Sequence, residues 1–304
     1  MKNSTDSLPQ TIIPDESTFA PMLNRLFGIE SFRPGQLEAI QHVLHQRDTL
    51  VVMPTGSGKS LIFQFCAIAM PDTALVISPL IALMKDQVDR LQSRGINATY
   101  INSSLSGDEQ GRRINNLAAG KYKLVYVAPE RLRNQAFLAA LRKAKVSLLA
   151  VDEAHCISQW GHDFRPDYLH IGDVRQMLGN PVTVALTATA TVDVQQDVIN
   201  QLKLPSAERV ITGFSRPNLV FHVRLTPDLQ SKMQAIIRVL GVVKGAGIVY
   251  VGTRREAEEL ASTLEGQYKV PSFVYHGGLE KSQRTLMQDA FLSTSNAVMI
   301  ATNA

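Results

Sequence analysis

The stretch that most constrains how this chain can fold is 49–60, which reads TLVVMPTGSGKS. A short apolar and β-branched run stops at a turn rich in Pro and Gly, and an apolar segment, 61–70, follows without a further breaker. This order is typical of a buried strand, a tight loop and the start of a helix. In such a loop, backbone N–H groups and the helix N-terminus converge on one point, where an anion binds. The stretch therefore predicts an α/β domain with a phosphate-binding loop.

The side chains of this loop suit a nucleotide. Glycine permits unusual backbone angles and a close approach of phosphate, Lys59 would reach the β- and γ-phosphates, and the Ser60 hydroxyl would hold Mg²⁺. The residues expected to bind the nucleotide here are Met53, Pro54, Thr55, Gly56, Ser57, Gly58, Lys59 and Ser60. The strict pattern G-x-x-x-x-G-K-[ST] requires Gly at position 53, where this chain has Met. A glycine-rich turn that merely precedes Lys-Ser therefore remains an alternative on this stretch alone.

A second motif lies about ninety residues further on, where the apolar run 147–151 ends in Asp152-Glu153-Ala154-His155. Adjacent carboxylates at the end of a strand suit a nucleotide site, because ligands bind at that edge of an open sheet. Asp152 would hold Mg²⁺, and Glu153 would polarise the water that attacks the γ-phosphate. The alternative is a solvated strand end with two surface acids. The combination of the acid pair with the phosphate loop favours the nucleotide site.

The rest of the chain alternates near-continuous apolar runs with helical stretches. The runs of the first part are 50–53, 74–78, 98–101, 124–127, 148–151 and 182–187. Strands buried on both faces of a parallel sheet have this pattern, and helices such as 81–93 and 193–202 would provide the crossovers. Periodicity is lost around 205–218, and a second series of strands follows at 219–223, 248–251, 273–275 and 298–302. We expect a disordered N-terminus at 1–14, one doubly wound α/β domain at 15–208 and a second, incomplete one at 209–304.

Composition narrows the class of protein. A net charge of +4 fits a polyanionic partner. The two cysteines, Cys66 and Cys156, lack metal-ligand spacing, so we expect a reducing compartment, no disulfide and no zinc site. The N-terminus has no apolar signal-peptide core, and no apolar run approaches the roughly 18 residues that span a bilayer. These features predict a soluble, cytoplasmic protein without a membrane partner.

Several further motifs occur in an order that resembles the RecQ family of DNA helicases, within helicase superfamily 2. The resemblance covers the chain from about Leu26 to Ala304. The matching stretches are FGIESFRPGQ (27–36), 52–60, ISPLIALMKDQ (77–87), YVAPERL (126–132), 152–168, ALTATA (185–190) and YHGGL (275–279). The phosphate loop of this family commonly reads Met-Pro-Thr-Gly, which accounts for Met53. The resemblance implies two RecA-like domains, with ATP and Mg²⁺ as ligands and Lys59, Asp152, Glu153 and His155 as catalytic residues.

The resemblance also implies adenine recognition by Gln36 together with Arg33. An amide can pair bidentately with the donor and acceptor edge of adenine. Without the family, Gln36 is equally a solvated residue at a helix start.

A loop at 156–168 follows the acid pair and contains Trp160, the only tryptophan in the chain. Aromatic rings beside cations can stack on bases and hold phosphates of single-stranded DNA, and the resemblance implies that this loop couples DNA to ATP turnover. The alternative is that Trp160 and Phe164 are buried beneath a loop. The residues expected to contact DNA or to couple it are Ser78, Pro79, Lys85, Gln159, Trp160, His162, Phe164, Arg165, Thr187 and Thr189. For Ser78, Pro79 and Lys85 the alternative is ordinary helix capping.

The function implied is ATP-dependent 3′→5′ unwinding of single-stranded and partly duplex DNA in repair and recombination. Relatives close the ATP cleft with arginines of a Gln-x-x-Gly-Arg-x-x-Arg motif, which would lie beyond Ala304. We therefore expect these 304 residues to bind ATP–Mg²⁺ and DNA but to unwind poorly or not at all. The alternative is a non-catalytic fragment that binds ATP and DNA. A phosphate-loop protein of the transport or kinase type would leave Gln36 and the Trp160 loop unexplained.

Overall fold

The computed structural model describes residues 16–161, 163–213 and 218–302. The stretch expected to be disordered, 1–14, lies outside these residues. The chain divides into two compact units, Met1–Leu219 and Val220–Ala304, and each is described here by itself.

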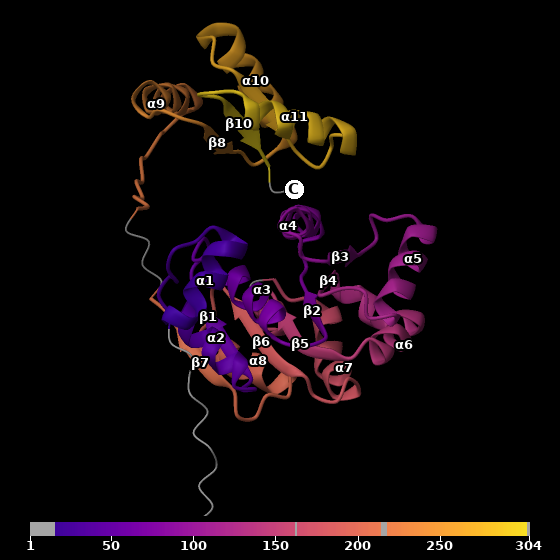
Figure 1. The fold of residues 1–304 in the computed structure, drawn as a ribbon. Helices are drawn as coiled ribbons and strands as arrows, with labels where there is room; N and C mark the ends of the chain where they lie inside the picture. Colours follow the sequence, from indigo (N-terminus) through magenta and orange to yellow (C-terminus); the bar gives the residue numbers. More distant parts are fainter. Residues whose placement is uncertain (1–15, 162, 214–217, 303–304) are drawn as a thin grey trace, which may run out of the picture. The chain divides into compact units, whose positions relative to one another are not determined.

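The first unit is built on one parallel sheet of seven strands (Figure 1). Apolar residues alternate between its two faces, so that Val51, Val76 and Ala150 point into one core and Val52, Ile77 and Val151 into the other. Because every strand is parallel, all the carboxyl ends lie at one edge. In spatial order the strands are β3 (Ala98–Ile101), β4 (Leu124–Val127), β2 (Thr73–Ile77), β5 (Val146–Val151), β6 (Val182–Thr187), β1 (Thr49–Val52) and β7 (Glu208–Ile211).

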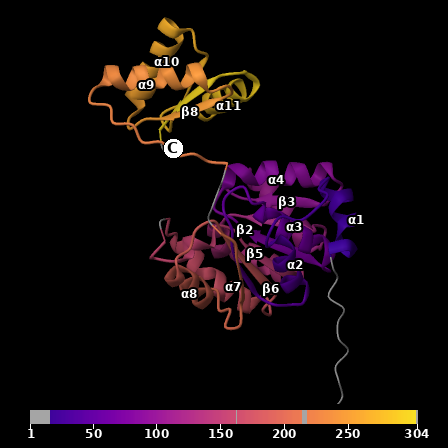
Figure 2. The ribbon, with the colours of Figure 1, turned by 90° about the vertical axis from the view of Figure 1, so that its left-hand side faces the viewer.

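Helices cover both faces of this sheet. The first core is closed by α1 (Glu16–Phe27), α2 (Gln36–Leu44), α3 (Lys59–Ala69) and α4 (Ile81–Ser93). The second core is closed by α5 (Gly107–Ala118), α6 (Gln135–Lys143), α7 (Ile171–Met177) and α8 (Val192–Gln201). In Figure 2, α2 and α8 lie on opposite sides of the strands. The result is the doubly wound α/β architecture that the sequence predicts.

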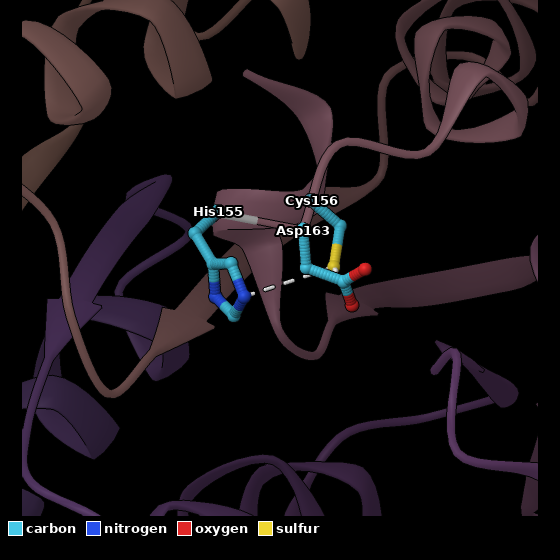
Figure 3. Close-up of side chains that lie close together, drawn as sticks. All are labelled: His155, Cys156 and Asp163. Carbon is cyan, nitrogen blue, oxygen red and sulfur yellow. Dashed lines mark hydrogen bonds between the residues drawn. The ribbon is translucent and has the colours of Figure 1, made fainter. Parts of the chain in front are cut away.

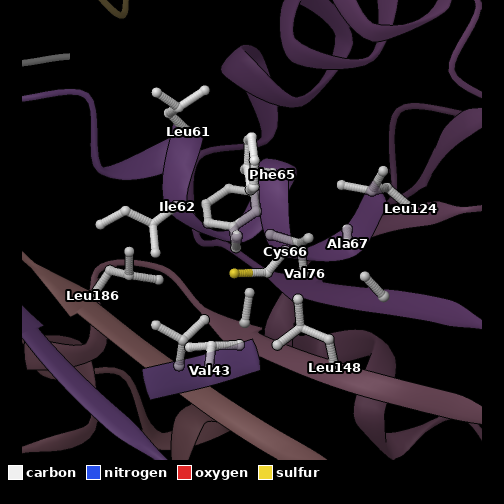
Figure 4. Close-up of a cluster of buried hydrophobic side chains, with 14 of the residues drawn as sticks. Val43, Leu61, Ile62, Phe65, Cys66, Ala67, Val76, Leu124, Leu148 and Leu186 are labelled. Carbon is white, nitrogen blue, oxygen red and sulfur yellow. The ribbon is translucent and has the colours of Figure 1, made fainter. Parts of the chain in front are cut away.

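The first core is packed to full burial around α3. Cys66 is fully buried among Val43, Ile62, Phe65 and Leu186 (Figure 4). Burial in these apolar surroundings raises the pKa of the Cys66 thiol well above its usual range. A thiol of this kind acts as a small apolar side chain. Cys66 therefore belongs to the core, as its apolar sequence context suggests.

The six strands expected in the first unit are present within two residues of their predicted bounds, but a seventh was missed. Strand β7 lies inside the stretch 205–218, where the sequence predicts a domain junction, and it pairs in parallel with β1 from Glu208 to Ile211. The predicted boundary between residues 208 and 209 is therefore wrong, because it would cut this strand. The sequence pattern does not reveal β7, because two of its four residues, Glu208 and Arg209, are charged, and only Val210 is buried in this edge strand.

The second unit contains a parallel sheet in the order β8 (Gly247–Tyr250), β10 (Val298–Ala301) and β9 (Ser272–Tyr275). Its helices are α9 (Leu229–Val242), α10 (Arg254–Tyr268) and α11 (Lys281–Ser293). The strand predicted at 219–223 is wrong. That segment has no regular structure, and the side chains of Val220, Phe221 and Val223 are exposed. An apolar run forms a strand only where a neighbouring strand accepts its backbone hydrogen bonds, and none of the described strands pairs with it.

Among the described residues, no helix is both long enough and apolar enough to span a membrane.

Candidate nucleotide-binding and catalytic site

The phosphate loop leads from the end of β1 into α3, and its shape depends on two glycines. Gly56 and Gly58 both have a φ of 83°, in the left-handed region that disfavours larger residues. A Cβ atom on Gly58 would lie only 2.6 Å from Nε2 of Gln36. The loop is anchored to the sheet by the buried Met53, whose N–H donates to the carbonyl oxygen of Thr187 at 3.1 Å. Glycine at position 58 is therefore a geometric requirement.

The buried side chain of Gln36 forms hydrogen bonds to the backbone of this loop. The side chain is 2% exposed. Its amide nitrogen donates to the carbonyl oxygens of Ser57 at 2.9 Å and Gly58 at 3.0 Å, and its Oε1 accepts from the N–H of Arg33 at 2.9 Å. The Arg33 guanidinium also donates to the carbonyl oxygen of Gly56. Adenine pairing by Gln36 thus stays a prediction, and it requires these hydrogen bonds to break.

Lys59 is folded across the loop that it belongs to. Its Nζ donates to the carbonyl oxygens of Met53 at 3.0 Å and Pro54 at 3.4 Å. Partial burial lowers the pKa of Lys59, while the charges of Glu153 and Asp152 act in the opposite direction. The Ser57 hydroxyl oxygen is buried and has no hydrogen-bond partner among the described residues. A phosphate bound in the cleft could accept hydrogen bonds from Lys59, because its oxygens are strong hydrogen-bond acceptors and Lys59 lines the cleft.

The acid pair follows β5 and faces the same space. Asp152 accepts hydrogen bonds from the N–H of Glu153 at 3.0 Å and from the Ser78 hydroxyl at 3.3 Å. Burial, and next the charge of Glu153, raises the pKa of the Asp152 carboxyl to about 6. A buried carboxylate with few donors gains most from a cation beside it. The Ser60 hydroxyl lines the same cleft, and hard oxygen ligands of this kind suit Mg²⁺.

Glu153 is connected to the end of β6 through His155. His155 Nδ1 lies 3.3 Å from Glu153 Oε2 and 2.9 Å from the Thr187 hydroxyl. The hydroxyl of Thr187 donates to the carbonyl oxygen of Thr189 at 3.1 Å. Its one hydrogen is used there, so Nδ1 of His155 carries the proton that joins the two side chains. The structure thus brings together residues of two separate motifs, 152–155 and 185–190.

The phosphate loop and the acid pair line one cleft of about 300 Å³. Lys59, Ser60, Asp152 and Glu153 line it together with apolar side chains from α4 and β4. The sequence interpretation missed this apolar wall, in which Tyr126 is 3% exposed. Gln64 donates to the Tyr126 hydroxyl at 3.0 Å and to Gln87 at 2.9 Å. A period-3.6 helix pattern cannot reveal this network, because its partners come from three different elements.

The loop after the acid pair presents its tryptophan to solvent. Trp160 is 81% exposed, whereas Phe164 is half-buried. The alternative in which Trp160 lies beneath a loop is therefore wrong for this structure. Gly161 allows the turn, since a Cβ there would lie 2.5 Å from the carbonyl oxygen of His155. His162 lies outside the described residues, so its expected role stays a prediction.

Arg165 ties the loop to neighbouring motifs. Its N–H donates to the carbonyl oxygen of Cys156 at 2.8 Å, and its guanidinium donates to Asp163 at 2.9 Å and to the carbonyl oxygen of Pro79 at 3.5 Å. Arg165 thus joins the loop that carries Trp160 to the turn just after the acid pair and to the residue that follows Ser78 at the end of β2.

The remaining residues expected to contact DNA differ in accessibility. Ser78 and Pro79 are buried, and the Ser78 hydroxyl donates a hydrogen bond to the Asp152 carboxylate. Lys85 is exposed on α4 and forms an ion pair with Asp89 one helical turn later. Gln159 is exposed beside Trp160. Direct DNA contact is therefore sterically available to Gln159 and Lys85, whereas Ser78 faces the nucleotide cleft.

Tyr168 is a site residue that sequence reasoning missed. Its side chain is fully buried in the second core, and its hydroxyl donates to the carbonyl oxygen of Asp152 at 2.9 Å. This contact holds the peptide between the two acids, where Glu153 adopts the left-handed conformation with φ 47°. The sequence gives one indication of it: Tyr168 is the last residue of the stretch 152–168, which resembles the RecQ family.

Comparison with known proteins decides the family. A family model described as "DEAD/DEAH box helicase" matches residues 33–198, more than half of the chain, and the match includes the phosphate loop, the acid pair and the Trp160 loop. The chain belongs to the DEAD/DEAH box helicase family. The ATP-dependent DNA helicase RecQ of Bacillus subtilis (strain 168) is 46% identical over 285 residues, covering 93% of this chain and 48% of the relative. RecQ of Pasteurella multocida (strain Pm70) is 43% identical over 292 residues, covering 96% and 46%.

The resemblance to RecQ helicases is therefore confirmed, and this helicase-family chain spans about half the length of the curated relatives it matches. Solved structures agree on the fold. The structure of Mycobacterium smegmatis helicase Lhr bound to single-stranded DNA and AMP-PNP matches with a TM-score of 0.67 at 20% identity, covering 90% of this chain and 40% of the other. The expected RecA-like α/β fold is thereby confirmed.

Proposed function

We propose that this chain is the ATP-hydrolysing and DNA-binding part of a RecQ-type helicase that moves 3′→5′ along single-stranded DNA and unwinds duplexes. The observation that carries the proposal is one cleft lined by Lys59, Ser60, Asp152 and Glu153. The Ser57 hydroxyl of the same phosphate loop is buried and has no hydrogen-bond partner within the described part of the chain. This donor set fits the phosphates of ATP, and the names of the curated relatives agree with ATP as the nucleotide.

In this proposal the residues of the chain act in a fixed order. Lys59 releases the carbonyl oxygens of Met53 and Pro54 and donates to the β- and γ-phosphates. Glu153, oriented by His155, accepts a proton from water as the water oxygen bonds to the γ-phosphorus. The bond from that phosphorus to the β-phosphate oxygen breaks, leaving ADP and inorganic phosphate, and Glu153 returns the proton to solvent.

Mg²⁺ belongs to the same proposal. Ser60 and Asp152 would hold it, and when bound it would offset the negative charge of the phosphates.

Single-stranded and partly duplex DNA are the proposed polymer partners. Trp160, exposed next to the exposed Gln159, offers a stacking surface on the same loop as Arg165, and stacking on aromatic rings together with cationic contacts is how sequence-independent binding of single strands works. We place this activity on DNA in the cytoplasm, at the nucleoid where the host is bacterial, in repair and recombination.

The test combines binding with turnover. ATP hydrolysis is measured with and without single-stranded DNA for the chain and for Glu153→Gln, alongside binding of a fluorescent ATP analogue. We expect Glu153→Gln to bind the analogue normally and to lose about 10²–10⁴-fold in turnover, the usual range for a general base. Glu208→Gln is the matched control, because Glu208 is an acid paired with Arg47 at the amino end of β7, away from the cleft.

Each possible result either supports or refutes the role of Glu153 as the general base. Loss of turnover in Glu153→Gln alone supports the assignment of the base. Equal turnover in both variants would refute it. Binding of the analogue and of DNA by a chain that does not hydrolyse ATP would favour a nucleotide-binding module over an enzyme.

A further inference from the structure

Three metal-ligating side chains meet at the start of the Trp160 loop, outside the nucleotide cleft. His155 and Cys156 lie on a 3₁₀ turn, η2 (Ala154–Ile157), and Asp163 returns to them from the far side of the loop (Figure 3). Their ligand atoms all lie within 4.8 Å of one another. Cys156 Sγ is 3.8 Å from His155 Nε2 and 3.7 Å from Asp163 Oδ2. Sequence spacing could not reveal this group, because the third ligand is brought in by the turn at Gly161.

The histidine is oriented as a metal ligand should be. Its Nδ1–H faces the Thr187 hydroxyl and the Glu153 carboxylate, as described above. The neutral ring then carries its lone pair on Nε2, which is the atom that faces Cys156. A carboxylate or hydroxyl on the outer nitrogen is the usual support of a metal-bound histidine, since it selects the tautomer and raises the basicity of the ligand.

The distances and the donor types select the kind of ion. Tetrahedral zinc has bonds of about 2.3 Å to sulfur and 2.0–2.2 Å to nitrogen or oxygen, which places its ligand atoms roughly 3.3–3.6 Å apart. The two measured pairs are a few tenths of an ångström longer, and the Asp163 side chain is 49% exposed and able to move. One nitrogen, one thiolate sulfur and one carboxylate oxygen suit a borderline-soft ion such as Zn²⁺ and not Mg²⁺.

We propose that His155 Nε2, Cys156 Sγ and Asp163 Oδ2 form a binding site for Zn²⁺ or a similar divalent ion, with water as the fourth ligand. Binding replaces the thiol proton of Cys156, which passes to solvent, with a bond from sulfur to the ion. It also withdraws Asp163 from Arg165, which now donates to it at 2.9 Å. The expectation of no zinc site rested on sequence spacing alone, and this proposal replaces it.

The site is tested by titrating the metal-free chain with Co²⁺, which reports its ligands by absorption. We expect one ion per chain, a sulfur-to-cobalt charge-transfer band, visible bands of tetrahedral cobalt, and loss of the spectrum when Zn²⁺ is added. A spectrum without the charge-transfer band, or no binding, would overturn the proposal. None of these readouts needs ATP or DNA, so the result is independent of the proposed helicase activity.

Variants locate the ion. Cys156→Ser should remove the charge-transfer band, and Cys66→Ser, at the other buried cysteine, should keep it. Because Cys156 is buried and its replacement can disturb folding, Asp163→Asn provides a second test on an exposed side chain. We expect it to weaken Zn²⁺ at least about 10-fold, the lower range for loss of even an outer-shell partner. Asp173→Asn is its control, an exposed acid paired with Lys203. Equal weakening by both Asn variants would overturn the assignment.

Discussion

Replacing Gly58 by Ala tests whether the phosphate loop is built against Gln36. The new Cβ must adopt a φ of +83° and would lie 2.6 Å from Gln36 Nε2. The left-handed conformation costs a non-glycine residue about 1–2 kcal/mol. Displacing the amide also weakens its two hydrogen bonds to Ser57 and Gly58, each worth about 0.5–1.5 kcal/mol. We therefore expect the free energy of unfolding to fall by about 2–5 kcal/mol, together with the affinity for ATP.

A second glycine separates these two contributions. Gly28 also has a positive φ, +65°, but a Cβ there would meet nothing within 4 Å. In urea denaturation, Gly28→Ala should therefore show only the conformational cost of about 1–2 kcal/mol. The double variant Gln36→Ala with Gly58→Ala should lose less than the sum of its single changes, because the shortened side chain makes room. If Gly58→Ala destabilises no more than Gly28→Ala, the contact with Gln36 does not shape the loop.

Three further predictions concern Asp152, Trp160 and Arg175. The pKa of Asp152 is raised to about 6 in the folded chain, so the folded chain binds this proton more tightly than the unfolded chain does. The folded state therefore loses stability as the pH rises from about 4 to 6. In metal-free buffer, Asp152→Asn should raise the melting temperature at pH 7 but not at pH 4. Trp160→Ala should weaken single-stranded DNA binding by about 1–3 kcal/mol in fluorescence anisotropy, whereas Val192→Ala, also an exposed apolar residue, should not. Arg175→Met should lower the free energy of unfolding by about 3–5 kcal/mol, because it leaves the Asp48 carboxylate without its charge partner. The guanidinium of Arg175 lies 2.7 Å from that carboxylate. A loss below about 1 kcal/mol would show that water stabilises this ion pair instead.

The sequence predicted most of the fold because its signals are local. The strand, loop and helix of the phosphate site are continuous in the chain, and fully buried parallel strands read as uninterrupted apolar runs. β7 and the segment 219–223 were misassigned for the same physical reason. Whether a run forms a strand depends on a pairing partner that is distant in sequence. Residues 208–211, two charged and two apolar, therefore form a strand beside β1, and the apolar run 219–223 does not.

In the candidate site, too, local motifs were predictable from the sequence and contacts between distant elements were not. Residue types and order were enough to select Lys59, Ser60, Asp152 and Glu153, because each role follows from a motif. The partners of these residues were not predictable. In this structure the amide of Gln36 donates to the carbonyl oxygens of Ser57 and Gly58, and no sequence pattern indicates these partners. Tyr168, sixteen residues from Asp152 in sequence, holds its carbonyl group through one hydroxyl. Such contacts depend on how elements pack, which no local pattern encodes.

In the proposed function, the segment from Asp152 to Tyr168 is where DNA contact would be coupled to hydrolysis. Glu153 has a φ of 47°, a conformation that costs about 1–2 kcal/mol and is stable only where neighbours hold it. Tyr168 holds the peptide before it, and His155 contacts its side chain. Trp160 lies between these two anchors on the same short loop. A base stacked on Trp160, as proposed, would therefore act on a loop joined at both ends to Asp152 and Glu153.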